Sequence, residues 1–190
     1  MDFLKGTGVA IITPFKKNGE IDFNAYELLI DFYINNGINY LVILGTTGES
    51  HSISFEEKDK ILKSVVKFNK GRLPLIVGFG NNNTQKLVNE LSNFELESFS
   101  AVLSVCPYYN KPSQVGLYEH FFSVSKASPI PLILYDVPSR TGVSISNETI
   151  LKLLEKCDNI IGIKDATGDV KKGINLIKNT PKSFNVISGD

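Results

Sequence analysis

Seven short apolar runs recur along the chain at intervals of about 25–35 residues, the length of one strand–helix unit. Most are continuous rather than alternating, which indicates strands buried on both faces, as in a parallel sheet covered by helices. The seven predicted strands are Gly8–Pro14, Tyr40–Leu44, Leu75–Phe79, Ala101–Cys106, Pro131–Tyr135, Ile160–Ile163 and Phe184–Ile187. The pattern therefore predicts an α/β protein.

The segments between these runs have the apolar spacing of amphipathic helices. Ser54 and Glu57 form the pattern of a capping box before one segment, and Gly37 and Gly71 follow two segments as stop signals. The six predicted helices are Phe23–Asn35, Phe55–Asn69, Thr84–Leu96, Val115–Ala127, Asn147–Cys157 and Asp169–Lys178.

Regular alternation of strands and helices allows a doubly wound open sheet or a closed barrel. In a barrel, reacting groups come from the ends of many strands, whereas an open sheet gathers them at one crevice. Polar, reactive residues end most of the predicted strands, and this spread favours a (β/α)8 TIM barrel. The chain supplies about seven of the eight βα units, the last incomplete. Because no linker divides the sequence, we expect a single barrel domain over residues 1–190 that lacks the eighth unit.

Composition excludes several classes of function. Lys plus Arg and Asp plus Glu each number 20 among 190 residues, so net charge does not indicate nucleic acid or an anionic membrane as a partner. No apolar run is long enough to span a bilayer, and the N-terminus has no signal-peptide pattern. Cys106 and Cys157 make no disulfide framework, which favours a reducing cytoplasm. No metal-ligand spacing is present.

Lys164 directly follows the apolar run Ile160–Ile163 and is the most informative residue for chemistry. If that strand is buried on both faces, burial disfavours the ammonium form and lowers the pKa of the side chain. A neutral amine can attack a ketone and form an iminium. The alternative, commoner on position alone, is a lysine that leaves the strand and extends its ammonium to water.

Tyr135 and Arg140 lie at the end of the neighbouring predicted strand and on the loop after it. A phenol beside Lys164 can shuttle protons between a carbonyl oxygen, the amine and water. An aromatic plug with a hydrogen-bonded hydroxyl is an equal alternative for Tyr135. The Arg140 guanidinium suits a substrate carboxylate through a bidentate pair, and a plain surface arginine is its alternative.

Two further strand ends carry candidate residues. The segment Gly45-Thr46-Thr47-Gly48 predicts a tight turn whose N–H groups and hydroxyls can hold a carboxylate and pass a proton. A loop that uses its Thr residues only for turn chemistry is the alternative. Tyr108 and Tyr109 suit an interface patch, a lid or core packing.

Four motifs occur together in a family-specific order and spacing. They are Gly45–Glu49, Pro107–Asn110, Tyr135–Gly142 and Gly162–Gly168. In these motifs the chain resembles the dihydrodipicolinate synthase/N-acetylneuraminate lyase family of class I aldolases, and the resemblance extends from Gly6 to Asp190. It implies a Schiff-base lyase on a TIM barrel, with no metal or organic cofactor.

The resemblance also implies roles for individual residues in the pyruvate half-reaction. Lys164 forms an iminium with pyruvate, and Thr46 and Thr47 hold the pyruvate carboxylate. Tyr135 is the proton shuttle, supported by Thr46. Tyr109 completes a proton relay in the site of a neighbouring subunit.

Arg140 selects the second substrate within the family. The resemblance implies that it binds the carboxylate of aspartate semialdehyde, which places the activity at the opening of the diaminopimelate route to lysine. Gly189 is expected to line the same pocket. Asp136 stands where Asn is commoner in the family, and no catalytic role is expected for it. The alternatives are a related pyruvate aldolase acting on a sugar acid or hydroxy-oxo-acid, and a non-catalytic barrel that only binds ligands.

The resemblance further implies a cytoplasmic homotetramer built as a dimer of dimers. Family members continue for about another hundred residues, through the eighth βα unit and C-terminal helices. The first and last strands of a seven-stranded chain are expected to have unpaired edges. We therefore expect the 190 residues by themselves to be poorly stable and inactive.

Overall fold

The structure is a computed structural model that describes residues 2–189. It divides into two compact units, Met1–Gly78 with Glu97–Ser100 and Phe79–Leu96 with Ala101–Asp190. The positions of the two units relative to each other are not determined, and each is described by itself. The single barrel domain over residues 1–190 stays a prediction.

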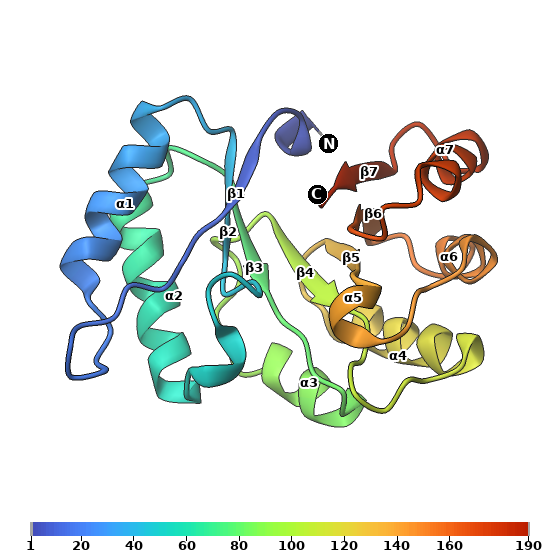
Figure 1. The fold of residues 1–190 in the computed structure, drawn as a ribbon, viewed down its shortest axis with the longest axis horizontal. Helices are drawn as coiled ribbons and strands as arrows, with labels where there is room; N and C mark the ends of the chain where they lie inside the picture. The colour runs from blue at the N-terminus through green and yellow to red at the C-terminus, as the bar shows by residue number, and fades with distance from the viewer. Residues whose placement is uncertain (1, 190) are drawn as a thin grey trace. The chain divides into compact units, whose positions relative to one another are not determined.

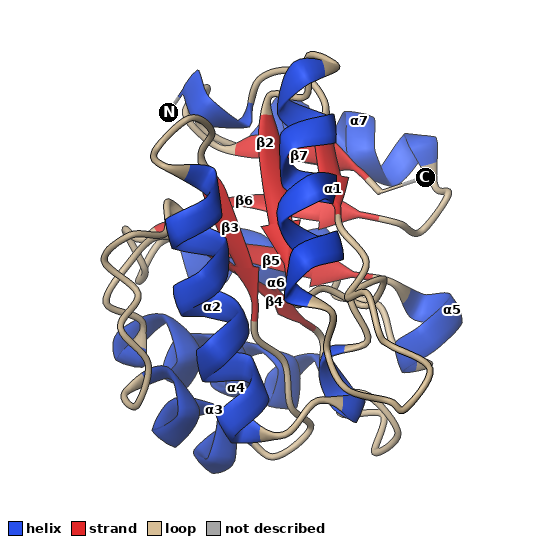
Figure 2. Ribbon diagram, turned by 90° about the vertical axis from the view of Figure 1, so that its left-hand side faces the viewer, coloured by secondary structure: helices blue, strands red, loops and turns tan. Residues whose placement is uncertain are grey.

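The first unit contains three parallel strands in the order of the chain, with two helices side by side over one face (Figures 1 and 2). Its elements are η1 (Asp2–Leu4), β1 (Gly8–Ala10), α1 (Phe23–Asn35), β2 (Tyr40–Ile43), η2 (Ser50–Ser52), α2 (Phe55–Asn69) and β3 (Leu75–Gly78). All four residues of β2 are buried. This full burial confirms the prediction of a strand covered on both faces for β2, whereas all three residues of β1 are only half-buried.

The capping box predicted before α2 is present. The Ser54 side chain accepts a hydrogen bond from the Glu57 backbone, and the Glu57 carboxylate accepts one from the Ser54 N–H at 2.9 Å. The helix ends where Lys70 and Gly71 both adopt positive φ. These local signals explain why the predicted and observed bounds of α2 coincide.

The second unit contains four parallel strands, again in the order of the chain. Its elements are α3 (Thr84–Leu91), β4 (Ala101–Val105), α4 (Gln114–Ala127), β5 (Leu132–Asp136), α5 (Pro138–Thr141), α6 (Asn147–Leu154), β6 (Ile160–Asp165), α7 (Val170–Asn179) and β7 (Asn185–Ser188). Within this unit α4 packs against both α3 and α6, and α6 against α7 (Figure 1). No helix within residues 2–189 is long and apolar enough to cross a membrane.

Several segments differ from the prediction. The predicted strand Gly8–Pro14 ends at Ala10, and the predicted helix Asn147–Cys157 ends at Leu154. The predicted helix Thr84–Leu96 ends at Leu91, because the Ser92 hydroxyl and the Asn93 amide donate to carbonyls of the preceding turn. The four-residue helix α5 was not predicted. It begins with Pro138 and ends at Gly142, which has φ of +73°.

His120 is a buried histidine on α4 that joins two helices of the second unit. Its Nδ1 lies 2.8 Å from the hydroxyl of Thr84 at the start of α3. Its Nε2 is buried without a hydrogen-bond partner among the described residues. Burial lowers the pKa of His120 to about 4, so the folded chain holds a neutral imidazole at neutral pH.

We expect this burial to make stability depend on pH between about 4 and 6.5. In that window the unfolded chain binds a proton at His120 and the folded chain does not, so the free energy of unfolding rises with pH. Between pH 5 and pH 7 the contribution is about 2 kcal/mol. Chemical denaturation at both pH values measures it, with His120→Gln as the variant that cannot titrate. Equal pH slopes for the two proteins would contradict the expectation.

Candidate active site

Lys164 and Tyr135 are direct neighbours on adjacent strands. β5 and β6 are parallel, and Tyr135 pairs with Lys164 in their register. Near the start of the two strands the pairing shifts by one residue, because Leu132 pairs with Ile160 whereas Ile133 pairs with Gly162. Without that shift Tyr135 would pair with Ile163, and Lys164 would have a different neighbour. The irregularity therefore places both functional side chains on one face of the strand pair.

The Lys164 amine lies over the Tyr135 ring in a partly dry environment. Its Nζ is 4.7 Å from the ring centroid, and the Tyr135 side chain is only 8% exposed. Burial of the Lys164 side chain lowers its pKa below the ordinary value. The cause is desolvation, which penalises the ammonium and leaves the neutral amine unchanged.

Gly189 packs closely against the side chain of Lys164. A Cβ at Gly189 would lie 3.0 Å from Cε of Lys164 and 2.8 Å from Cβ of Ala166. The Gly189 N–H donates to the Asp165 carbonyl at 2.8 Å, which holds the segment after β7 against the end of β6. The structure thus brings together three of the predicted site residues, Lys164, Tyr135 and Gly189.

Thr46 and Thr47 lie on the loop after β2 in the first unit, and both are exposed. The loop is a double turn, with Gly48 N–H donating to the Gly45 carbonyl and Glu49 N–H to the Thr46 carbonyl. Leu44 and Glu49 bracket it with φ of +56° and +54°. Such left-handed conformations in non-glycine residues are concentrated at functional loops.

Gly78 fixes the start of this loop from the neighbouring strand. A Cβ at Gly78 would lie 2.4 Å from the carbonyl oxygen of Leu44 and 3.0 Å from Cα of Gly45. Any side chain would therefore displace the backbone on which Thr46 and Thr47 stand. The loop is positioned by close backbone contact within the first unit.

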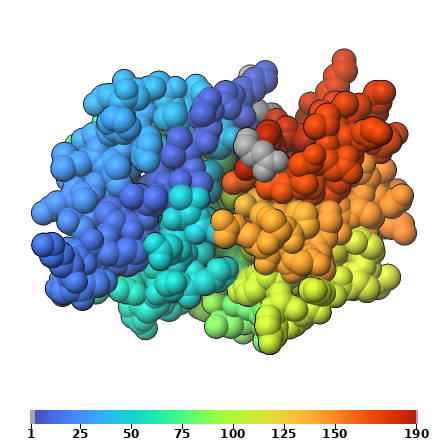
Figure 3. All heavy atoms as spheres, in the orientation of Figure 1, coloured from blue at the N-terminus to red at the C-terminus, as the bar shows by residue number. Residues whose placement is uncertain are grey.

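Arg140 lies on α5 and is exposed. The loop between β5 and α6, orange in Figure 3, lies at the surface. Inside the loop, Thr141 donates to the Val143 carbonyl at 2.8 Å, and Gly142 N–H donates to the Pro138 carbonyl at 2.9 Å. These bonds give the loop a defined shape, so the guanidinium extends from a braced segment.

Tyr109 stands on the loop after β4, where it is 88% exposed with φ of +73°. Its neighbour Lys111 also has positive φ, at +50°. The exposed side chain is available to another molecule. A role in the site of a neighbouring subunit stays a prediction.

Asp136 and Lys172 form a buried ion pair that the sequence analysis did not identify. Lys172 Nζ lies 2.5 Å from Oδ2 of Asp136, which is fully buried. The Ser144 hydroxyl donates to the same oxygen at 2.7 Å. Because 36 residues separate the two charges, no local motif could have indicated this pair.

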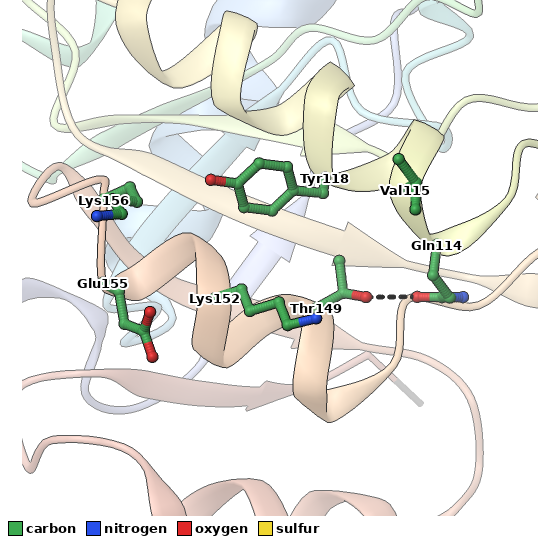
Figure 4. Close-up of a pocket in the computed structure, with 7 residues that line it drawn as sticks. All are labelled: Gln114, Val115, Tyr118, Thr149, Lys152, Glu155 and Lys156. Carbon is green, nitrogen blue, oxygen red and sulfur yellow. Dashed lines mark hydrogen bonds between the residues drawn. The ribbon is translucent and has the colours of Figure 1, made fainter.

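A cavity of about 410 Å³ lies between α4 and α6 on the helical side of the second unit (Figure 4). It is lined by Gln114, Val115, Tyr118, Thr149, Lys152, Glu155 and Lys156. Gln114 already accepts hydrogen bonds from the Thr149 hydroxyl and the Ser146 N–H. None of the predicted site residues lines it, so this cavity is not the candidate active site.

The candidate site combines an amine and a phenol on two paired strands, β6 and β5. A depressed lysine pKa supplies a nucleophile, and an adjacent phenol can carry protons to and from it. Residues 2–189 contain no group of three or more His, Cys, Asp or Glu side chains that could hold a metal ion.

Comparison with known proteins shows one family throughout. The profile of the Dihydrodipicolinate synthetase family matches residues 3–190. The 4-hydroxy-tetrahydrodipicolinate synthase of Flavobacterium psychrophilum is 51% identical over 185 residues, which cover 97% of this chain and 63% of the relative. The chain therefore spans about 63% of the length of this curated relative.

Solved structures agree with the family and the fold. The dihydrodipicolinate synthase of Aquifex aeolicus is 43% identical with a TM-score of 0.92, over 97% of this chain and 63% of that one. The chloride-inhibited dihydrodipicolinate synthase of Acinetobacter baumannii, complexed with pyruvate, has the same identity, TM-score and coverage. The predicted fold class, an α/β chain with βα units of the TIM-barrel type, is confirmed.

Proposed function

Because the chain belongs to the dihydrodipicolinate synthetase family, we propose that it supplies the Schiff-base site of a 4-hydroxy-tetrahydrodipicolinate synthase. The reaction joins pyruvate to aspartate semialdehyde in the diaminopimelate route to lysine. The pyruvate-bound relative from Acinetobacter baumannii supports the first substrate. The observation that carries the proposal is the Lys164 amine, with its lowered pKa, 4.7 Å from the Tyr135 ring.

The first half of the reaction uses the Lys164 nitrogen. The neutral amine attacks the keto carbon of pyruvate, and loss of water leaves an iminium. The iminium draws electrons from the methyl group, so a methyl proton leaves and an enamine forms. We assign the proton transfers to Tyr135, supported by Thr46, and the pyruvate carboxylate to Thr46 and Thr47.

The second half forms the new carbon–carbon bond. The enamine carbon attacks the aldehyde carbon of aspartate semialdehyde. This step restores the iminium on Lys164, and the former aldehyde oxygen takes up a proton and becomes a hydroxyl. The amine of that substrate then adds to the iminium carbon, closes the ring and releases Lys164. We assign the carboxylate of aspartate semialdehyde to Arg140, beside a pocket wall formed by Gly189.

A substrate comparison tests the proposal. The product of the complete reading frame is assayed with pyruvate and aspartate semialdehyde, and separately for cleavage of sugar acids and hydroxy-oxo-acids. We expect turnover only with aspartate semialdehyde. Preference for a sugar acid would replace the proposal by a related aldolase activity, and binding of pyruvate without any turnover would replace it by a ligand-binding role.

Replacing Arg140 with Ala is expected to raise KM for aspartate semialdehyde by about 10–100-fold, because a charge-assisted hydrogen-bond pair is lost. KM for pyruvate should stay within about twofold. Arg140→Lys keeps the charge without the planar fork and should recover only part of the loss. Steady-state kinetics with each substrate varied in turn provides the measurement. A rise confined to pyruvate would contradict the assignment.

The proposed assembly is a cytoplasmic homotetramer that pairs two dimers. The exposed Tyr109 supports a contribution from each subunit to a neighbouring site. Analytical ultracentrifugation of the complete protein checks the assembly. A solved relative is described as a monomeric dihydrodipicolinate synthase variant, so a monomer is the contrary outcome.

A further inference from the structure

A closed triangle of polar side chains lies at the base of the loop that carries Arg140. Lys172, on α7, donates from Nζ to Oδ2 of Asp136 at 2.5 Å and to Oγ of Ser144 at 2.9 Å. Ser144 donates to the same carboxylate oxygen at 2.7 Å. The Asp136 side chain is fully buried, and that of Lys172 is 14% exposed. We call these three side chains the Lys172 triangle.

The triangle joins the two ends of one loop. Asp136 is the last residue of β5 and directly precedes the loop, and Ser144 directly follows residues 137–143. The Ser144 carbonyl also accepts a hydrogen bond from the Gln114 side chain at 2.8 Å, which anchors that end to α4. Lys172 donates hydrogen bonds to both of these residues from α7, a third element. Its ammonium therefore holds together the two ends of the loop of residues 137–143, which we call the Arg140 loop.

The closure depends strongly on the Lys172 charge. A fully buried carboxylate is costly unless an opposite charge and hydrogen bonds compensate it. The second oxygen, Oδ1 of Asp136, is buried and has no hydrogen-bond partner among the described residues. Without Lys172 the carboxylate would keep only the hydrogen bond from the Ser144 hydroxyl, and the two ends of the loop would have to separate for water to reach it.

The triangle faces away from the Lys164 amine. Successive side chains on a strand point to opposite faces, so Asp136 lies on the face opposite to Tyr135. Tyr135 shares its face with Lys164, to which it is paired in register. A change at Lys172 is therefore expected to act on the Arg140 loop without removing the nucleophile.

We propose that Lys172 is a positioning residue for the second substrate: it locks Asp136 and Ser144 together and thereby holds Arg140 where the carboxylate of aspartate semialdehyde binds. The inference rests on the proposed function for the role of Arg140. Groups that hold a substrate-binding side chain in place commonly change binding or activity by about 10–100-fold when removed.

Substitutions on α7 provide the test, in the product of the complete reading frame. Lys172→Met keeps the length of the stem and removes the charge, Lys172→Arg keeps the charge, and Lys171→Met is the matched control at the exposed neighbouring position. We expect Lys172→Met to raise KM for aspartate semialdehyde about tenfold or more. Borohydride trapping of pyruvate on Lys164 should stay within about twofold in all variants. Lys172→Arg should restore most of the loss, and Lys171→Met should match the parent.

A double-variant cycle with Arg140 separates positioning from a general structural effect. If Lys172 acts through Arg140, Lys172→Met should change KM far less in an Arg140→Ala background than in the parent. Equal effects in both backgrounds would overturn the inference. Should Lys172→Met fail to fold, the pair Asp136→Leu with Lys172→Met removes both charges together, and a parental KM in that protein would also overturn it.

The order of measurement keeps the two proposals distinct. Trapping on the parent protein comes first. If Lys164 takes up no pyruvate, the proposed function fails and the inference fails with it. If the parent reacts normally and the Lys172 variants behave like Lys171→Met, only the inference fails.

Discussion

Replacing Lys164 with Met is expected to lower turnover by at least about 10⁴-fold, because the methionine side chain has no amine to form the iminium that activates pyruvate. Met has a similar length and keeps the apolar stem in contact with Gly189 and the Tyr135 ring. The kinetic loss should therefore report chemistry rather than unfolding. Stopped assays with both substrates at high concentration provide the measurement.

The stability of the same variant supplies its control. The pKa of Lys164 is lowered in the folded chain by desolvation, so protonation of its amine costs more free energy in the folded chain than in the unfolded chain. The ammonium therefore opposes folding at neutral pH, and its removal should maintain or raise the melting temperature. An inactive Lys164→Met protein with a markedly lower melting temperature would contradict a catalytic interpretation and favour a structural role.

Replacing Tyr135 with Phe is expected to lower kcat by about 10²–10⁴-fold, the usual contribution of a positioned acid–base group. Phe keeps the buried ring beneath the Lys164 amine and removes only the hydroxyl. The substitution thus separates a proton shuttle from an aromatic plug, the two interpretations that position alone left open. Under both interpretations the variant should fold, and only under the proton-shuttle interpretation should its turnover be slow.

Tyr118→Phe is the matched control for Tyr135→Phe. Tyr118 stacks on Phe122 at 5.9 Å on α4 and lines the cavity between α4 and α6. Removal of its hydroxyl should leave kcat unchanged. If Tyr135→Phe were as active as Tyr118→Phe, the proton shuttle would have to be assigned to another group.

Local sequence signals were sufficient for most of the elements. The capping residues Ser54 and Glu57 and the stop at Gly71 lie within a few positions of α2, and the bounds of that helix were predicted correctly. Continuous apolar runs likewise indicated the buried strands. Lys164 and Tyr135 are paired near the carboxyl ends of the neighbouring parallel strands β6 and β5, where the sequence had placed them.

Non-local features could not be predicted in this way. The register shift between Leu132 and Ile133 decides which residue pairs with Tyr135, and it depends on how two strands pair through space. The bond from Lys172 to Asp136 likewise joins two elements through space. Burial of His120 depends on the packing of α4 against α3, which a lone histidine in a helical pattern does not reveal.

Trapping of pyruvate on Lys164 tests the central claim most directly. The complete protein is incubated with pyruvate, reduced with borohydride, digested and analysed by mass spectrometry. We expect one reduced pyruvate unit on the peptide that contains Lys164, with a yield that rises with pH as the amine loses its proton. A folded protein with no adduct at Lys164, or with the adduct on another lysine, would contradict it.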